Sequence, residues 1–597
     1  MCGLVAVVTA ADQRPELTEP GLIAMRDRLA HRGPDDATLW SSANAMLAHR
    51  RLAVIDPTPA GAQPMLTPDE RFVLVYNGEL YNDADVRANL AREGVEFRTH
   101  CDTETLLLAL RRWGVGALAR VRGMYAFALL DRADQTLLIA RDPLGIKPLY
   151  VHRRALAAGG TELVVASEIP AILAHPRVSA DPDFVTISAY LTTLRSTLGS
   201  RTLFRGIETL RPGEWRRYDL RRAPLPCESA TIEPDAVTPG ACADLRAAID
   251  DAVDRHCRSD VPMCCLLSGG LDSTIITARA HARAPDLRTF CAGAETDEPS
   301  ADLAVADRVA AELGTRHTRA PISRDLFRER WPDLVGRTGL PLTTPNTVAI
   351  YEVARTLRDA GCVVTLSGEG ADELFGGYAP ALELAALHEM ALDRPSPGRF
   401  HLDSNGWVPV GVKSSVVRAS AYAAAEEDTP LFEQYEADFA ACAERAPGDS
   451  PMQAHLRFHR RVNLPNLLER LDLATMLASV EGRTPFADAP ITALAERLPM
   501  AHKFERSGED APARTKIALR GAYAGAIPEE PRTRAKASFP LPFQAWVGDH
   551  TEVLDAPFAR DLFTDAALAG VRANPGAAWS FAWPMINVAL WSRRWWG

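Results

Sequence analysis

The chain has 597 residues, of which 47% are hydrophobic and 24% charged, with a formal net charge of -11. This composition is ordinary for a soluble globular protein, and the negative balance argues against nucleic-acid or anionic-membrane partners. No window of about 18 apolar residues predicts a membrane span, and no signal-peptide pattern opens the chain. The ten cysteines include no CxxC pair, so we expect a reducing, cytoplasmic location rather than a disulfide framework.

The first 220 residues alternate short β-rich runs, such as LVAVV, FVLVYNGE and TLLIARD, with polar turns. This pattern predicts an α+β unit over 1–220, in which mostly antiparallel sheets are stacked and flanked by a few helices. Residues 221–240, RRAPLPCESATIEPDAVTPG, are rich in proline and small residues and have no periodicity. They are predicted to be a linker.

From residue 241 to 597 the pattern changes to buried strands alternating with amphipathic helices, as in MCCLLSGGLDSTIITARA and CVVTLSGEGADELF. Such alternation predicts an α/β unit whose parallel sheet is covered on both faces. Residues 379–530 have a helical pattern almost throughout, so this unit is expected to carry a largely helical extension.

A cysteine stands directly behind the initiator methionine, in MCGLVAVV. Three interpretations stay open from these letters alone. Cys2 could be an accident of composition, a small buried residue that starts a strand, or a nucleophile exposed when Met1 is removed.

The motif SGGLDS, residues 268–273, lies between an apolar run and a helical run. That context predicts a turn at a helix N-terminus, where free backbone N–H groups and the helix dipole attract anions. A carboxylate beside a polyphosphate usually holds Mg²⁺, which is the role expected of Asp272. A plain strand–helix turn is the alternative, although the full motif is more specific than SGG alone.

A second glycine-rich loop, SGEGADELFGGY at 367–378, also follows an apolar strand directly. Glu369, Asp372 and Glu373 supply carboxylates there. Open parallel sheets bind ligands beyond the carboxyl ends of their strands, so the two loops are predicted to share one Mg–ATP crevice. A surface turn is the alternative interpretation.

With both loops in view, nearly the whole chain resembles the family of glutamine-hydrolysing asparagine synthetases. SGGLDS resembles its pyrophosphate loop and SGEGADELFGGY its second ATP loop, while TMLASVEGRTPFAD (475–488) resembles the segment that shapes the acceptor pocket. KIALR (516–520) and RAKASFPLP (534–542) resemble its two lysine segments. The front half resembles the family's class II glutaminase domain, which has an N-terminal-nucleophile-hydrolase-like fold.

The resemblance implies that Cys2, freed from Met1, attacks glutamine. Its own α-amine would serve as the base, because the thiolate rather than the thiol is the nucleophile. Five further positions resemble groups of the family that hold the glutamine α-carboxylate, hold its α-ammonium, or form the oxyanion hole: Arg50; Glu79 and Asp102; Asn77 and Gly78. Taken singly, each has a structural alternative as a solvated charge, a turn or a helix cap.

For the second site, the resemblance implies ATP and Mg²⁺ as cofactors, with Asp272 and Asp372 as metal ligands. Glu369 is expected to act near the attacking amine, and Lys536 to stabilise charge during nucleotide transfer. The positions implied to bind ATP are Leu266, Ser268, Gly269, Gly270, Asp272, Ser273, Ser367, Gly368, Glu369, Lys516 and Lys536.

The implied activity is a ligase reaction in which ammonia from glutamine amidates an adenylated carboxylate, giving AMP and pyrophosphate. Aspartate is the expected acceptor. The family's acidic DEP-type stretch is, however, replaced by Gly339-Leu340-Pro341, so another carboxylic acid of specialised metabolism is the alternative. A β-lactam or macrolactam synthetase and a stand-alone glutaminase are less favoured. All expected partners are small molecules, apart from a possible homodimer, and GMYAFALLD (123–131) resembles one wall of an ammonia tunnel.

Overall fold

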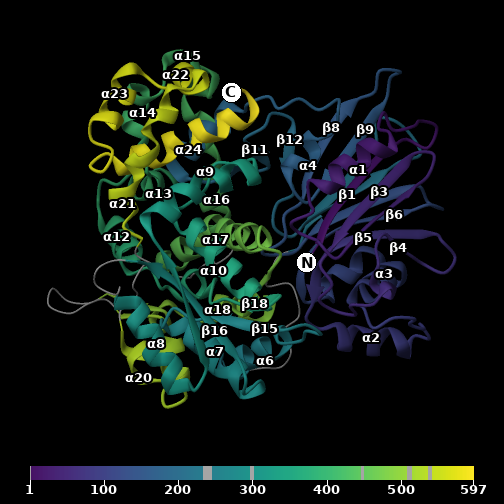
Figure 1. The fold of residues 1–597 in the computed structure, drawn as a ribbon, viewed down its shortest axis with the longest axis horizontal. Helices are drawn as coiled ribbons and strands as arrows, with labels where there is room; N and C mark the ends of the chain where they lie inside the picture. The colour runs from purple at the N-terminus through teal and green to yellow at the C-terminus, as the bar shows by residue number, and fades with distance from the viewer. Residues whose placement is uncertain (1, 233–244, 296–300, 445–449, 507–513, 535–540) are drawn as a thin grey trace.

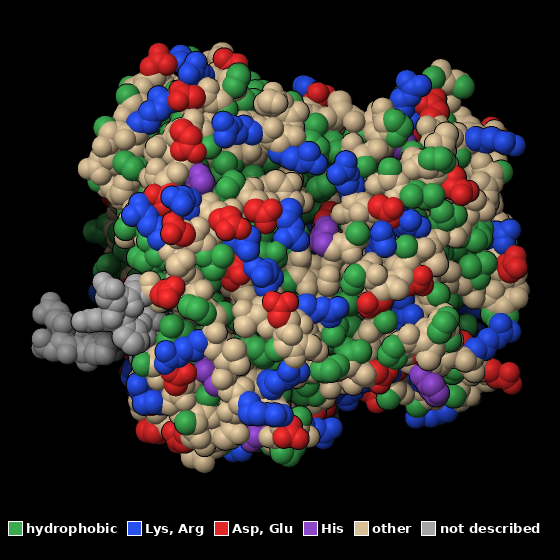
Figure 2. Space-filling view, in the orientation of Figure 1, with side chains coloured by type: hydrophobic (Ala, Val, Ile, Leu, Met, Phe, Trp, Pro, Cys, Tyr) green, Lys and Arg blue, Asp and Glu red, His purple; other side chains and the backbone are tan. Residues whose placement is uncertain are grey.

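The computed structural model describes residues 2–232, 245–295, 301–444, 450–506, 514–534 and 541–597. Figure 1 shows a sheet-rich half and a helix-rich half side by side, with the N-terminus at their boundary. In Figure 2 acidic and basic side chains are interspersed over the visible face. Within the described ranges, no helix combines the length and the apolar character needed to cross a membrane.

The N-terminal half contains two antiparallel sheets, as predicted. One sheet has eight strands in the order β10-β11-β12-β8-β9-β1-β3-β2, and the other has six in the order β14-β13-β7-β6-β5-β4. The strands of the first are β1 (Cys2–Thr9), β2 (Asp36–Ser41), β3 (Ala45–Arg51), β8 (Tyr150–Ala155), β9 (Thr161–Ala166), β10 (Thr197–Leu198), β11 (Arg201–Thr202) and β12 (Ile207–Thr209). Those of the second are β4 (Met65–Leu66), β5 (Phe72–Leu80), β6 (Gly123–Asp131), β7 (Thr136–Arg141), β13 (Glu214–Asp219) and β14 (Cys227–Thr231).

Strand β1 shows how the sequence builds this sandwich. Leu4, Ala6 and Val8 are fully buried in a core shared with the six-stranded sheet. Val5 and Val7 belong to a second core on the opposite face. Successive side chains of a strand point to opposite faces, so a continuous apolar run such as LVAVV marks a strand covered on both sides.

Helices cover the outer faces of both sheets. Helices α1 (Glu19–Asp27), α4 (Ile169–Leu173) and α5 (Phe184–Thr193) contribute to the core beside the eight-stranded sheet. Helices α2 (Asp83–Arg92) and α3 (Asp102–Trp113) pack on the six-stranded sheet. The N-terminal half therefore has four layers, two of sheet between two of helix.

Part of the stretch predicted to be a linker is a strand instead. Strand β14 pairs with β13 in antiparallel register, Glu214 opposite Thr231 and Tyr218 opposite Cys227. Every residue of β14 is exposed, so it has none of the apolar alternation by which a half-buried edge strand is recognised. Residues 233–240 of the predicted linker lie outside the described residues.

The second half contains the predicted parallel sheet, in the strand order β17-β16-β15-β18-β19. The strands are β15 (Met263–Leu266), β16 (Arg288–Ala294), β17 (Arg316–Ile322), β18 (Val364–Leu366) and β19 (Glu481–Arg483). Both faces are covered, because the adjacent residues Cys264 and Cys265 enter different cores. Helices α6 (Leu245–His256) and α7 (Leu271–Arg283) pack on one face, and α10 (Asn346–Asp359) packs on the other.

The predicted helical extension follows α11 (Ala371–Phe375). It is interrupted by the short strands β19, β20 (Phe504–Glu505) and β21 (Arg514–Thr515), and short 3₁₀ helices connect several of its α-helices. The principal helices are α12 (Ala379–Met390), α13 (Pro397–Asn405), α16 (Thr429–Glu444), α17 (Pro451–Met476), α18 (Ala489–Arg497), α19 (Ile517–Ala522), α23 (Asp565–Ala573) and α24 (Trp579–Trp595).

A continuous apolar core, here called the interface cluster, joins the two halves. It contains buried residues from the sheet-rich half and from strand β18, helix α17 and the turn before α18. Its buried members are Leu52, Val54, Ile55, Tyr81, Met124, Leu144, Ile146, Val364, Leu464, Leu468, Met476 and Ala487. The two halves thus pack against each other through hydrophobic side chains. Removal of this apolar surface from water stabilises the contact between them.

Candidate active sites

Cys2 begins strand β1 and is buried where the two sheets of the N-terminal half meet. Its backbone N–H donates to Asn77 Oδ1 at 3.0 Å, and its carbonyl accepts from Arg32 Nε at 3.0 Å. Burial raises the pKa of the Cys2 thiol above its ordinary value. A buried thiol is a poor nucleophile until it loses its proton, so attack from this position requires a nearby base.

A small cavity of about 20 Å³ lies beside Cys2. Strand β5, the end of β3 with the loop that follows it, and the start of α3 provide most of its wall, and one residue of β19 completes it from the other half of the chain. The residues that line it include the charged side chains of Arg51, Glu79, Asp102 and Glu481, together with Gly78. Four of the six residues predicted for the glutaminase site are therefore gathered here, namely Cys2, Gly78, Glu79 and Asp102.

Asn77 lies against this cavity through its bond to Cys2. Its Nδ2 group is buried and, among the described residues, has no hydrogen-bond partner. An unpartnered buried donor is costly, so its persistence at a site is a reason to look for a ligand acceptor. At the next residue, an added Cβ on Gly78 would lie 2.2 Å from the Met124 carbonyl oxygen. Asn77 contacts Cys2 and Gly78 lines the cavity, and their role as two oxyanion donors stays a prediction.

The structure does not bring Arg50 to the cavity, contrary to prediction. Its guanidinium lies 3.0 Å from Asp27 on the other face of the sheet. Arg51 lines the cavity instead and donates to the Thr58 and Asp56 carbonyls at 2.8 and 2.5 Å. Consecutive residues of a strand point to opposite faces, so a one-residue error in placing the motif exchanges a pocket residue for an outer one.

Glu79 and Asp102 are buried side by side. Burial, followed by the charge of Asp102, raises the pKa of Glu79 well above its ordinary value. Burial also raises the pKa of Asp102, which accepts from Tyr76 Oη at 3.1 Å and from the Leu80 N–H at 3.0 Å. Glu79 Oε1 is buried and has no hydrogen-bond partner among the described residues. A cationic group placed here would relieve both burial penalties.

Two residues of the second half were missed as parts of this site. Glu481 lines the cavity, and Arg483 Nη2 lies 3.5 Å from Glu79 Oε2 while its Nε donates to Glu481 at 2.6 Å. Both come from β19 within the segment VEGR, which the resemblance associated with the acceptor pocket. No local pattern in the sequence indicates that this edge strand faces the other half, so only the tertiary structure could find them.

The second site is a crevice of about 360 Å³ at the carboxyl ends of β15 and β18. The strand–turn–helix context predicted for SGGLDS is present, with Gly270 as the N-cap of α7. The two loops touch, since an added Cβ on Gly368 would lie 3.0 Å from Asp272 Cβ. The predicted residues that line the crevice are Leu266, Ser268, Gly270, Asp272, Ser273, Ser367, Gly368, Glu369, Asp372 and Lys516, whereas Gly269 lies in the loop without lining it.

Lys516 lies between the two carboxylates predicted to bind Mg²⁺. Its Nζ is 2.6 Å from Asp272 Oδ2 and 2.6 Å from Asp372 Oδ1. An added Cβ on Gly377 would lie 1.8 Å from that same Asp372 oxygen, so this position excludes any side chain. Asp272 Oδ1 is buried without a hydrogen-bond partner among the described residues. Oxygen donors of this kind fit Mg²⁺ held jointly with substrate phosphates.

Glu369 faces a guanidinium that the sequence reasoning missed. Arg470 of α17 contacts Glu369 Oε1 at 3.0 Å and donates to Thr344 Oγ1 at 3.0 Å. Arg470 also lines the crevice, beside Asn346 of α10. It lies in the C-terminal part of the long helix α17, about a hundred residues from the loop it contacts, and no spacing rule links the two. Lys536 lies outside the described residues.

Comparison with known proteins agrees with this division. Residues 1–225 match the model of a glutamine amidotransferase domain, and residues 244–590 match that of asparagine synthase. A putative glutamine-hydrolysing asparagine synthetase of Mycobacterium tuberculosis is 33% identical, over 92% of this chain and 88% of the relative. Glutamine-hydrolysing asparagine synthetase 3 of Bacillus subtilis is 30% identical, over 90% and 87% respectively.

The fold, the two sites and these matches define a glutamine amidotransferase unit fused to an ATP-dependent synthetase unit. The chain belongs to the asparagine synthase family and is a glutamine-dependent ligase of the asparagine synthetase type.

Proposed function

We propose that this enzyme transfers the amide nitrogen of glutamine to an ATP-activated carboxylic acid, with aspartate as the acceptor and asparagine as the product. One observation carries the proposal. The same chain contains a buried Cys2 whose N–H donates to Asn77, and a two-loop crevice in which Asp272 and Asp372 both contact Lys516. The names of the relatives, which are asparagine synthetases, support aspartate as the acceptor.

In the first site, Cys2 Sγ attacks the side-chain carbonyl of glutamine. Removal of Met1 would turn the nitrogen that now donates to Asn77 into a free amine, which takes the thiol proton and returns it to the leaving ammonia. Asn77 Nδ2 and the Gly78 N–H would donate to the oxyanion of the tetrahedral intermediate. Water then hydrolyses the thioester to glutamate and regenerates the thiol.

Arg51 and the acidic pair Glu79 and Asp102 would hold the rest of the glutamine molecule. A guanidinium fork matches the α-carboxylate. The α-ammonium would lie beside the two buried carboxylates, whose raised pKa values fall when a cation pairs with them. This arrangement replaces Arg50 of the sequence prediction with its neighbour.

In the second site, an oxygen of the acceptor carboxylate attacks the α-phosphorus of ATP and pyrophosphate leaves. Backbone N–H groups of the loop at 268–270 and the N-terminus of α7 would bind phosphate oxygens. Asp272 and Asp372 would hold Mg²⁺, which neutralises the developing phosphate charge. Lys516, and Lys536 by prediction, would bind the pyrophosphate. Ammonia then attacks the carbonyl carbon of the acyl-adenylate, the bond from that carbon to the phosphate oxygen breaks, and AMP leaves. Glu369 is the proposed carboxylate for the released proton.

The interface cluster supports passage of ammonia between the sites. Met124 of β6 belongs to it, as do Leu468 and Met476 of α17, and β6 is the strand predicted to form a tunnel wall. An apolar path keeps ammonia unprotonated, because desolvation disfavours the ammonium form.

One observation favours a second acceptor class. Residues 339–346, which border the crevice through Asn346, contain no carboxylate. Arg470 donates to Thr344 of this segment and also contacts Glu369, so the Glu369 carboxylate is already paired. A free α-ammonium needs its own counter-charge when buried. A carboxylic acid without an α-amine would make no such demand.

ATP–pyrophosphate exchange, measured with aspartate and with a panel of other carboxylic acids, tests the proposal. Exchange that depends on aspartate, with asparagine formed from glutamine, is the expected result. Exchange only with an acid that lacks the α-amine would move the assignment to the second class, and glutaminase activity without exchange for any acid would refute the ligase assignment.

The variant Cys2→Ala separates the two sites. It is expected to lower glutamine-dependent amide formation by at least about 10³-fold, because the nucleophile is lost. Amide formation from added ammonium salt should stay within about twofold of the native rate, since the second site is untouched. Equal loss of both activities would contradict the division of labour proposed here.

A further inference from the structure

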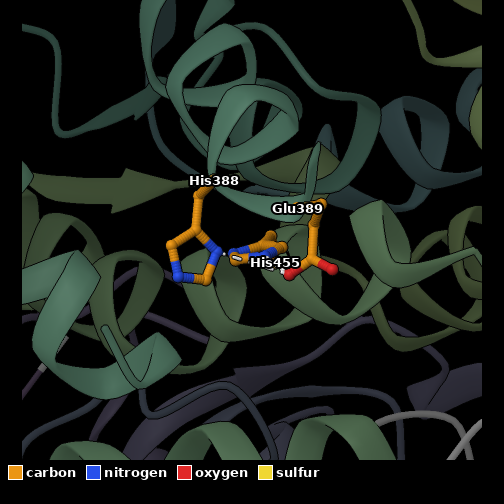
Figure 3. Close-up of side chains that lie close together, drawn as sticks. All are labelled: His388, Glu389 and His455. Atoms are coloured by element: carbon orange, nitrogen blue, oxygen red, sulfur yellow. Dashed lines mark hydrogen bonds and ion pairs between the residues drawn. The ribbon is translucent and has the colours of Figure 1, made fainter. Parts of the chain in front are cut away.

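Helices α12 and α17 bring together two histidines and a glutamate that the proposed reaction does not use. His388 and Glu389 end α12, and His455 lies in the second turn of α17. One ligand atom of each residue lies within 4.8 Å of those of the other two. Figure 3 shows the three side chains pointing toward a common centre. His388 and His455 are buried and Glu389 is partly exposed.

The hydrogen bonds of His388 leave a lone pair directed at this centre. Its Nε2 lies 2.9 Å from the Pro395 carbonyl oxygen, so Nε2 must carry the proton, because a carbonyl only accepts. In the neutral imidazole, Nδ1 then carries the lone pair. It is buried and has no hydrogen-bond partner among the described residues, and it lies 3.4 Å from Glu389 Oε1. An unpaired buried acceptor beside a carboxylate is unfavourable unless a cation lies between them.

His455 also has one ring nitrogen directed at the cluster and the other directed at a neighbouring side chain. Its Nε2 faces Glu389 Oε1 at 3.0 Å, and its Nδ1 faces His401 Nε2 at 2.9 Å. In the tautomer that carries its proton on Nδ1, His455 donates that N–H to His401 Nε2, and its Nε2 then presents a lone pair toward Glu389. Metal-binding histidines usually donate their second ring N–H to such a partner, which fixes the ring and its tautomer.

The distances suit a small tetrahedral ion. Zinc ligands at about 2.0–2.1 Å lie about 3.3 Å from one another in a tetrahedron, close to the 3.0 and 3.4 Å between Glu389 Oε1 and the two imidazole nitrogens. Two imidazoles and one carboxylate, with water in the fourth position, are a known zinc donor set. The other carboxylate oxygen, Oε2, accepts from Arg394 at 2.9 Å, which orients the group.

Aromatic rings enclose the histidines. Phe400 stacks on His388 with ring centroids 4.3 Å apart, and Phe439 packs edge-on against His455 at 4.9 Å. A hydrophobic shell of this kind limits water around a metal and strengthens its bonds to protein ligands.

We propose that His388, Glu389 and His455 form a binding site for a divalent transition-metal ion of the zinc class. The ion ties the end of α12, which follows the loop at 367–378, to α17, which carries Arg470. Its effect is to hold α12 against α17, the helix that lines the crevice through Leu467 and Arg470. The site does not depend on the identity of the acceptor or on the glutaminase reaction.

Metal content and metal-dependent stability test this site directly. The full chain is purified without a histidine tag, stripped with a chelator, and titrated with Zn²⁺ or with Co²⁺. The native protein is expected to bind a single ion at this site, to gain thermal stability with Zn²⁺, and to show the visible absorption of tetrahedral Co²⁺. The variants Glu389→Gln and His455→Gln are expected to lose affinity by about tenfold or more.

His502→Gln is the matched control, since His502 is exposed and distant from the cluster in sequence. It should retain native metal binding. A native protein that takes up neither ion and gains no stability would overturn the proposal, as would Glu389→Gln and His455→Gln variants that are folded and bind metal as tightly as the native chain. Far-UV circular dichroism identifies a variant that fails to fold, and the native stoichiometry remains decisive in that case.

Discussion

The buried carboxylates of the two pockets differ in their charge partners. In the glutaminase pocket, Glu79 and Asp102 have raised pKa values because burial outweighs the pairing available to them. In the crevice, Asp272 and Asp372 share the ammonium of Lys516 at 2.6 Å each. The first space measures about 20 Å³ and the second about 360 Å³.

The difference corresponds to what each pocket must bind. A small pocket whose acidic groups lack a full counter-charge is completed by a substrate that brings a cation, which glutamine does with its α-ammonium. A large crevice that already contains a lysine is suited to an anionic substrate, because the lysine can turn from the carboxylates to phosphate. Each pocket is thus electrostatically complementary to its proposed ligand before that ligand arrives.

Lys516→Met should give the largest effect on this contrast. It removes the cation shared by Asp272 and Asp372, so the crevice loses a phosphate partner and both carboxylates lose their contact with the ammonium group. We expect ATP–pyrophosphate exchange to fall about 10²–10³-fold, as when one charge-stabilising donor is removed from an active site. Glutaminase activity of the same variant, measured without ATP, is the internal control and should change little. A parallel fall in both would show that Lys516 supports the fold rather than the crevice.

The arginine pair in β3 gives the next effect. Arg51→Lys should raise the KM for glutamine by about 10- to 100-fold, because a lysine does not reproduce the bidentate, charge-assisted bonds of a guanidinium, worth about 1.5–3 kcal/mol. Arg50→Lys is the matched control one residue away, on the other face of the sheet, and should leave KM close to the native value. The reverse ranking, measured by steady-state glutaminase kinetics, would restore Arg50 as the carboxylate partner.

Acid sensitivity should give the smallest effect and should appear in both halves. Burial lowers the pKa of His49 in the first half to about 3, and that of His256 in the second to about 4. In the unfolded chain these imidazoles bind protons near pH 6.5, whereas in the folded protein they stay neutral at that pH. Stability is therefore fully present above that pH and is lost progressively as pH falls toward the folded pKa values, by about 1.4 kcal/mol per histidine at pH 5.5.

Denaturant unfolding between pH 7.5 and 5.5 measures this dependence. His49→Gln keeps a donor for the Tyr76 carbonyl, which His49 Nε2 contacts at 3.0 Å, and should flatten the pH profile of the first half. His502→Gln, at an exposed position, should leave the profile unchanged. A profile that His49→Gln does not alter would mean that other groups govern the acid response.

Local patterns in the sequence were sufficient for the main architecture. Each of these elements is indicated by residues that are close together in the sequence. They are the apolar runs of β1 and β15, the turn at 268–270 and the helical stretch from residue 379, and the structure confirms them. Strand β14 was missed because its exposed side chains carry no alternation.

The predicted site was less complete, for a different physical reason. Cys2, Asp272 and Asp372 stand in motifs that can be recognised along the chain. Arg470 and Arg483 enter their pockets only through tertiary packing of α17 and β19, and no spacing in the sequence encodes that contact. The exchange of Arg50 for Arg51 shows the limit of motif matching, since one step along a strand reverses the direction of a side chain.

Arg483 has a consequence for engineering by recombination. Its carbonyl accepts from the N–H of Ser367, at the start of the second ATP loop, at 2.8 Å, while its guanidinium lies 3.5 Å from Glu79 in the glutamine pocket. A chimera that takes its front and rear portions from different parents would have to preserve this residue and Glu79 as a pair. Otherwise one member of this buried pair would lose its counter-charge at the contact between the two halves. The chimera would then be destabilised at residues far in sequence from the point where the two parents are joined.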